Sequence, residues 1–298
     1  MDPRDPTVPA FPEFPAPFEV LAPGDQSLPL VVASPHSGSI YPRDFLAASR
    51  LDPATLRRSE DCFVDELYGR TPDLGAPLIR ALFPRAFVDV NREPFELDPR
   101  MFDDALPGWV VSRSPRIAAG LGTIARVVAS GCEIYRGKLR FEEALRRIGG
   151  LYRPYHTALS DLVRATRDRF GYCILIDAHS MPSMSGRVGD DLGGSGVDFV
   201  IGDCHGRSCA PDLSAEVARV LRGMGYSVVA NDPYPGGFTT RHYGRPATGI
   251  HAVQIEVNRA LYMDEQSYVR RPELARLSHD LTRLIGAIGG DPPVRPRG

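Results

Sequence analysis

The stretch Cys173-Ile174-Leu175-Ile176-Asp177-Ala178-His179-Ser180 decides the fold, because an apolar run passes directly into an Asp-Ala-His-Ser tetrapeptide. A short apolar run without polar alternation is typical of a strand that is covered on both faces. We therefore predict a buried strand over residues 173–176, with Asp177 and His179 emerging where the chain leaves the sheet.

Further apolar runs of the same character predict the rest of the sheet. They span residues 28–33, 77–83, 87–90, 197–201, 227–230 and 252–257. Apolar residues at helical spacing fall between them, and these predict helices over residues 63–68, 141–170, 212–224 and 272–288. This alternation predicts an α/β fold, a three-layer α/β/α sandwich around a mainly parallel, mixed sheet.

The domain organisation follows from length and from the prolines. The chain has 298 residues, 43% of them hydrophobic, which suffices for one large core. Prolines recur every few residues from Pro3 to Pro23 and oppose both helix and sheet ladder there. We predict a proline-rich extension over residues 1–27, a single catalytic α/β domain over residues 28–290 and a tail over residues 291–298.

Charge and cysteine usage limit the classes of partner and compartment. Lys and Arg number 35 against 37 Asp and Glu, so no charge excess indicates nucleic acid or a membrane surface, and a small ligand is favoured. The start of the chain lacks the apolar segment of a signal peptide, and no apolar span approaches ~18 residues. The five cysteines form no C-x-x-C pair, which favours a cytoplasmic protein. A homo-oligomer is left open.

Two histidines follow predicted strands that should end at one edge of the sheet. His36 lies in Ser34-Pro35-His36-Ser37-Gly38 after the first strand, and His179 follows the central one. Ligands bind beyond the carboxyl ends of such strands. A catalytic zinc has three protein ligands, so two histidines require one more, for which a carboxylate is suitable. The alternative for His36 is an ordinary turn histidine.

Ser59-Glu60-Asp61 supplies two candidate carboxylates at the start of the predicted helix over residues 63–68. The helix dipole also favours acidic residues at this position, and that explains one of the two without any metal.

Glu256 interrupts the apolar run of the last predicted strand. A charge in such a place requires a partner or a function. A glutamate beside a metal-activated water can act as a general base. The alternative is a structural ion pair with Arg259 or Arg92.

Three arginines are candidates for binding the substrate. Arg92 follows Asn91 at the end of the predicted strand over residues 87–90, and Arg241 and Arg245 lie in a loop rich in glycine and proline. Guanidinium groups suit the bidentate capture of a carboxylate. The loop is also compatible with a plain surface connection.

Taken together, five motifs in this order resemble the N-formylglutamate amidohydrolase family, over roughly Leu30 to Glu265. The motifs are Ser34-Pro35-His36-Ser37-Gly38, Asp61 with Val64-Asp65, Val88-Asp89-Val90-Asn91-Arg92, Asp177-Ala178-His179-Ser180 and the stretch from Gly236 to Glu256. The resemblance implies a fold similar to zinc carboxypeptidases and aspartoacylases.

The resemblance also implies roles for individual residues. His36, Asp61 and His179 look like the ligands of one zinc ion per chain, with Glu60 as the alternative ligand and another divalent metal as the alternative ion. Glu256 resembles the catalytic base. Arg92 and Arg241 resemble residues that polarise the scissile carbonyl or hold substrate carboxylates. We expect the substrate-binding residues to be Asn91, Arg241, Tyr243 and Arg245.

The function that the resemblance implies is hydrolysis of N-formyl-L-glutamate to formate and the free amino acid, within amino-acid catabolism. The chain departs from the family in its proline-rich start and in Asp61-Cys62-Phe63. One alternative is a zinc hydrolase of another N-acyl amino acid or a short peptide. A second is an inactive binding protein of the same fold.

Overall fold

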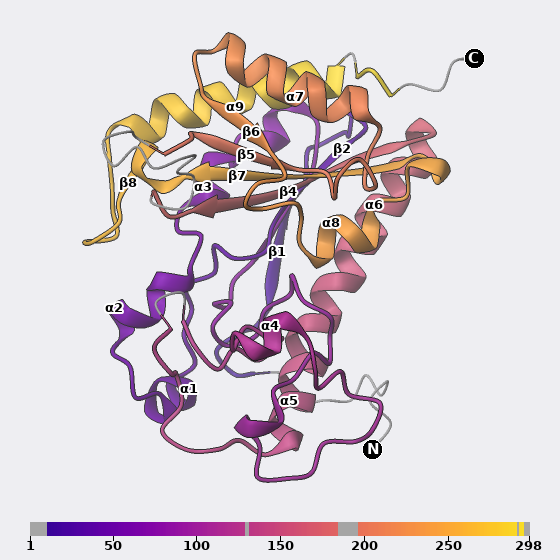
Figure 1. Cartoon of the computed structure of the whole chain (residues 1–298). Coiled ribbons are helices and arrows are strands. Elements are labelled where there is room, and N and C mark those ends of the chain that lie inside the picture. Colours follow the sequence, from indigo (N-terminus) through magenta and orange to yellow (C-terminus); the bar gives the residue numbers. More distant parts are fainter. Residues whose placement is uncertain (1–10, 129–130, 184–195, 291, 295–298) are drawn as a thin grey trace. The chain divides into compact units, whose positions relative to one another are not determined.

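The computed structural model of the chain describes residues 11–128, 131–183, 196–290 and 292–294 (Figure 1). Its internal contacts divide the chain into two compact units. The first unit comprises Met1–Glu19, Pro35–Glu60 and Arg80–Ala158, and the second comprises Val20–Ser34, Asp61–Ile79 and Leu159–Gly298. The expectation of one domain over residues 28–290 stays a prediction.

A seven-stranded sheet has the strand order β1-β3-β2-β4-β7-β5-β6. Its strands are β1 (Phe18–Leu21), β2 (Leu30–Ser34), β3 (Leu78–Ala81), β4 (Cys173–Met181), β5 (Phe199–Gly202), β6 (Val228–Ala230) and β7 (Ile250–Asn258). Strands β2, β4 and β7 run parallel, β5 pairs with β6 in parallel, and β5 pairs with β7 antiparallel. The predicted mainly parallel, mixed sheet is confirmed.

The pairing of β4 with β7 determines which side chains share a face. His179 is in register with Glu256, and Asp177 is in register with Gln254. Side chains alternate between the two faces of a strand, so these four residues lie on one face of the sheet. All nine residues of β4 are buried, and this polar face therefore lies inside the protein.

The opposite face of the sheet holds the apolar core of the second unit. Helices α3 (Val64–Leu67), α7 (Pro211–Gly223) and α9 (Glu273–Gly290) supply this core, and Figure 1 shows α7 and α9 covering one side of the strands. The amphipathic stripe of α9 consists of Leu277, Leu281, Leu284 and Ile288, spaced three or four residues apart and almost fully buried. Helix α8 (Phe238–Tyr243) packs on the other side, against β4 and β7.

The first unit is mainly helix and irregular chain. Its helices include α1 (Arg43–Ala48), α2 (Pro53–Leu56), α4 (Pro115–Ala118) and α5 (Phe141–Arg147). A π-helical turn, Ile148–Tyr152, joins α5 directly to α6 (Arg153–Phe170), which confirms the long helix predicted over residues 141–170. The remaining short elements are 3-10 turns at Arg57–Ser59, Thr71–Leu74, Pro99–Met101, Pro246–Thr248 and Arg259–Leu261, and a hairpin of β8 (Met263–Asp264) with β9 (Val269–Arg270).

Three sequence expectations about local structure are wrong. Residues 87–90 form a turn and not a strand, because the Phe87 and Val88 amides both donate to the Pro84 carbonyl. The segment Phe18–Leu21 is a strand despite the surrounding prolines, because none falls within these four residues. Residues 238–243 form helix α8 and not a loop.

Among the described residues, no helix has the length and hydropathy needed to cross a membrane.

Candidate active site

The centre of the site is a contact between Asp61 and His179. His179 lies near the carboxyl end of β4, and its Nδ1 is 2.9 Å from Oδ2 of Asp61. Asp61 immediately precedes α3, and the chain turns into this helix through Phe63, whose φ of 65° is left-handed. Both side chains are almost fully buried, so this pair of polar groups is enclosed by protein.

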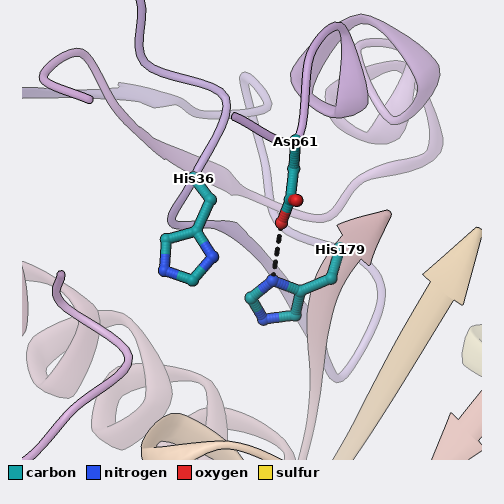
Figure 2. Close-up of side chains that lie close together, drawn as sticks. All are labelled: His36, Asp61 and His179. Atoms are coloured by element: carbon teal, nitrogen blue, oxygen red, sulfur yellow. Dashed lines mark hydrogen bonds and ion pairs between the residues drawn. The ribbon is translucent and has the colours of Figure 1, made fainter. Parts of the chain in front are cut away.

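His36 completes a group of possible metal ligands. It follows β2 by two residues, and one ligand atom from each of His36, Asp61 and His179 lies within 4.8 Å of the others. Figure 2 shows the three side chains directed toward a common point. The ligand atoms of a tetrahedral zinc site are about 3.3 Å apart, given metal–ligand bonds of about 2.0 Å. The three residues therefore form a group that could hold a metal ion once their ligand atoms draw closer together.

A second carboxylate orients each histidine. His36 Nε2 donates to Asp89 Oδ1 at 2.7 Å, and His179 Nε2 donates to Asp177 Oδ1 at 2.9 Å. A hydrogen bond at Nε2 assigns Nδ1 as the ligand nitrogen, the arrangement usual for metal-binding histidines. The sequence places Asp177 two residues before His179, at the predicted end of the strand. It gave no comparable signal for Asp89, which lies 53 residues from His36 along the chain.

The second oxygen of Asp61 is held by Arg259. The Arg259 Nη2 is 3.1 Å from Asp61 Oδ1, and its Nε donates to the Ser180 hydroxyl at 3.0 Å. Burial lowers the pKa of Arg259, but the neighbouring groups, Asp61 first among them, together outweigh burial and raise it above the usual value. The two oxygens of Asp61 thus have different partners, Oδ1 facing Arg259 and Oδ2 facing His179. The sequence gave no signal for this pair, because the partners are 198 residues apart.

Glu256 lies beside His179 on the neighbouring strand. The side-chain amide of Gln254 donates to Glu256 Oε1 at 2.9 Å. Burial, and then the charge of Glu256, raise the pKa of the buried Tyr68 hydroxyl. Glu256 and His179 thus lie next to each other on one face of the sheet.

Glu60 has different neighbours from Asp61. Its two carboxylate oxygens accept hydrogen bonds from the Tyr41 hydroxyl at 2.5 Å and from Arg57 Nε at 3.0 Å. The group that can hold a metal contains Asp61 and not Glu60.

Asn91 and Arg92 lie in the first unit, close to Asp89. The backbone amide of Asn91 donates to Asp89 Oδ1, and the Arg92 side chain donates to the backbone carbonyls of Leu121 and Asn91. Burial lowers the pKa of Arg92 to about 10, and the charge of Asp89 opposes this shift. Arg92 is consequently a partly buried cation in a fixed position.

The remaining predicted residues belong to α8 and its end. Arg241 is exposed on α8, and Tyr243 is buried, which raises the pKa of its hydroxyl. Arg245 Nη1 donates to the carbonyls of Arg241 and Gly244, so it closes the carboxyl end of the helix. At the site, Thr240 donates to Asp177 Oδ2 at 3.0 Å, a contact that the sequence did not suggest.

Comparisons with known proteins agree on one family. The sequence model of the N-formylglutamate amidohydrolase family matches residues 28–263. The N-formylglutamate deformylase of Pseudomonas putida is 32% identical over 253 residues, covering 84% of this chain and 87% of the relative. That of Pseudomonas aeruginosa is 31% identical over 272 residues, covering 90% and 94%.

A solved structure extends the likeness to three dimensions. The crystal structure of an N-formylglutamate amidohydrolase from Ralstonia eutropha superimposes with a TM-score of 0.85 at 39% identity, covering 92% of this chain and 97% of the other. The chain therefore belongs to the N-formylglutamate amidohydrolase family.

Proposed function

We propose that this chain hydrolyses the formyl amide of N-formyl-L-glutamate, giving formate and glutamate. One observation carries the proposal: the buried group of two imidazoles and a carboxylate lies beside a glutamate that is in strand register with one of the imidazoles. The related deformylases act on the same compound by name. The runner-up is hydrolysis of another N-acyl amino acid at the same site.

We propose His36, Asp61 and His179 as the ligands of one zinc ion. Two imidazoles and a carboxylate form a donor set that zinc uses in hydrolases, and the Nε2 hydrogen bonds set both imidazoles for binding through Nδ1. A bound zinc would supply a Lewis acid that lowers the pKa of water to about 7 and polarises the scissile carbonyl.

The side chains then perform the proton transfers. Glu256 accepts the proton of the attacking water and returns it to the amine nitrogen as the C–N bond breaks. Gln254 donates a hydrogen bond to Oε1 of Glu256 and so helps to orient the carboxylate. Arg92 stabilises the charge that develops on the carbonyl oxygen, because a buried guanidinium acts strongly at low dielectric.

The substrate carries two carboxylates, and cations must bind them. We propose Arg241 as the principal partner, with Asn91, Tyr243 and Arg245 as further substrate-binding residues. Arg241 is exposed on α8, and its planar guanidinium matches the geometry of a carboxylate. The side chain of Arg245 supports α8 in addition.

The wider setting is part of the same proposal. We propose a zinc-carboxypeptidase-like fold and one catalytic domain over residues 28–290, which the family match over residues 28–263 supports. The odd number of cysteines, five, and the absence of a C-x-x-C pair from the sequence support a reducing cytoplasm.

The test combines metal content with formate release from N-formyl-L-glutamate, before and after chelation, and with other N-acyl amino acids in parallel. We expect about one zinc per chain and formate release that the chelator abolishes. Zinc with release of a different acyl group would replace the substrate assignment. Absence of metal from active protein would refute the mechanism.

Two variants separate metal binding from proton transfer. His36→Ala should lose the metal, whereas Glu256→Gln should retain it and lose turnover by at least about 100-fold, the lower end of the usual contribution of general acid–base catalysis. Wild-type turnover in Glu256→Gln would remove Glu256 as the base.

A further inference from the structure

Gln254 joins two parts of the second unit that the proposed reaction uses. It lies on β7 two residues before Glu256 and is almost fully buried. Its Oε1 accepts from the Gly237 amide at 2.7 Å, and its Nε2 donates to Glu256 Oε1 at 2.9 Å. A backbone amide can only donate, so the orientation of the side-chain amide is determined and its NH₂ group must face Glu256.

The chain segment held by Gln254 leads directly into α8. Gly237 is the N-cap residue of this helix, which carries Arg241. Gly202, the register partner of Gln254 on β5, lies against the same segment, since a Cβ there would be 2.8 Å from the Gly236 nitrogen and the Tyr234 oxygen. The segment is therefore seated directly on the sheet at Gln254.

A second contact ties α8 to the metal-ligand group. Thr240 donates to Asp177 Oδ2, and Asp177 Oδ1 accepts from His179. Helix α8 is thus anchored at two points. Thr240 binds Asp177, which orients the proposed metal ligand His179, and the Gly237 amide binds Gln254, which contacts the proposed base Glu256.

We propose that Gln254 is a positioning residue. It fixes helix α8, which carries the proposed substrate-binding residue Arg241, and the Glu256 carboxylate relative to each other. This inference rests on the proposed function, in which Arg241 binds substrate and Glu256 transfers the proton. Gln254 acts through its two partners, the Gly237 amide and Glu256. Loss of the Gln254 side-chain amide has two effects. Helix α8 and Arg241 move, which raises KM, and the Glu256 carboxylate changes its orientation, which lowers kcat.

The test replaces Gln254 by Met, which has similar length and lacks both hydrogen bonds. We expect kcat for N-formyl-L-glutamate to fall on the order of 100-fold, the usual effect of a misplacement of about 1 Å, with KM raised and zinc content unchanged. In a Glu256→Gln background, Gln254→Met should raise KM again but lower kcat no further, because both changes act through one group. An equal additional loss of kcat in that background would overturn the inference.

Gln26→Met is the matched control. Gln26 donates to the Leu28 and Leu30 carbonyls and to the Thr166 hydroxyl, at the start of β2. The Gln26→Met variant loses a side-chain amide from the second unit, as Gln254→Met does, and it should keep the wild-type kcat and KM. A kcat loss in Gln26→Met equal to that in Gln254→Met would show a general effect of destabilisation and overturn the inference.

Hydrogen exchange gives a readout that does not depend on activity. Amides of residues 237–243 should exchange faster in Gln254→Met than in the wild type or Gln26→Met. Unchanged exchange there would refute the anchoring of α8. If the wild-type protein releases no formate, the proposed base fails with the proposed function, and exchange alone decides whether Gln254 anchors the helix.

Discussion

Single residues in this site are held by partners that lie both near and far along the chain. Asp61 lies between His179 and Arg259, and each histidine proposed as a ligand is hydrogen-bonded to its own aspartate. Outer carboxylates of this kind fix the orientation of the imidazole and raise its basicity. The strength of metal binding should therefore depend on Asp89 and Asp177 as well as on the ligands.

Asp177→Asn should weaken metal binding by about 10- to 100-fold without preventing folding. The amide that replaces the carboxylate is a poorer acceptor for His179 Nε2. Competition with a chelator of known affinity measures the change. Asp280→Asn, which removes the carboxylate that accepts from the Tyr226 hydroxyl at α9, is the control. Equal affinity in Asp177→Asn and the wild type would contradict the orienting role.

At the scale of elements, strong apolar periodicity was a reliable guide. The runs that became β2, β4, β5, β6 and β7 and the helices α7 and α9 appear near their predicted positions. The ligands that we propose could be selected from the sequence because the two histidines follow such runs, and the family resemblance added Asp61. Periodicity gave no information about α8, since its hold on the sheet comes from Gln254 and Asp177, partners that a single sequence does not reveal.

Gly202→Ala tests the seating of residues 234–237 on β5. A Cβ would lie 2.8 Å from three backbone atoms, of Gly236, Pro235 and Tyr234, which cannot rotate away. We expect a loss of about 1–3 kcal/mol in the free energy of unfolding, measured by thermal or denaturant unfolding.

Gly286→Ala in α9 is the matched control for that substitution. Its Cβ would meet no atom within 4 Å, and alanine favours a helix interior over glycine by roughly 0.5–1 kcal/mol. Stabilisation is therefore expected. Destabilisation of both variants by the same amount would contradict the steric explanation.

At the scale of the whole molecule, acid should weaken the fold through carboxylates that are hydrogen-bonded in the native state. Asp203 is an example at the end of β5. Burial raises its pKa, but hydrogen bonds from the Gly206 amide, Asn231 and Ser214 outweigh burial and lower it. A carboxylate with a lowered folded-state pKa stabilises the protein above its unfolded-state pKa, and this contribution is lost as pH falls toward the folded value.

Asp203→Asn should accordingly be less stable than the wild type near neutral pH, and the difference should shrink below about pH 4, the ordinary range of aspartate titration. Denaturant unfolding over a series of pH values measures it. Asp212→Asn, at an exposed position in the first turn of α7, is the control. A difference that stays constant with pH would contradict the linkage.

The long pairing of β4 with β7 has a kinetic consequence. The two strands are in register over nine residues and almost wholly buried, and they carry His179 and Glu256. Strands of this kind exchange their amides only when the entire molecule opens. We therefore expect that activity is lost on heating only through global unfolding, so that heat inactivation and global unfolding have the same rate constant. A tightly bound ion should slow both processes equally.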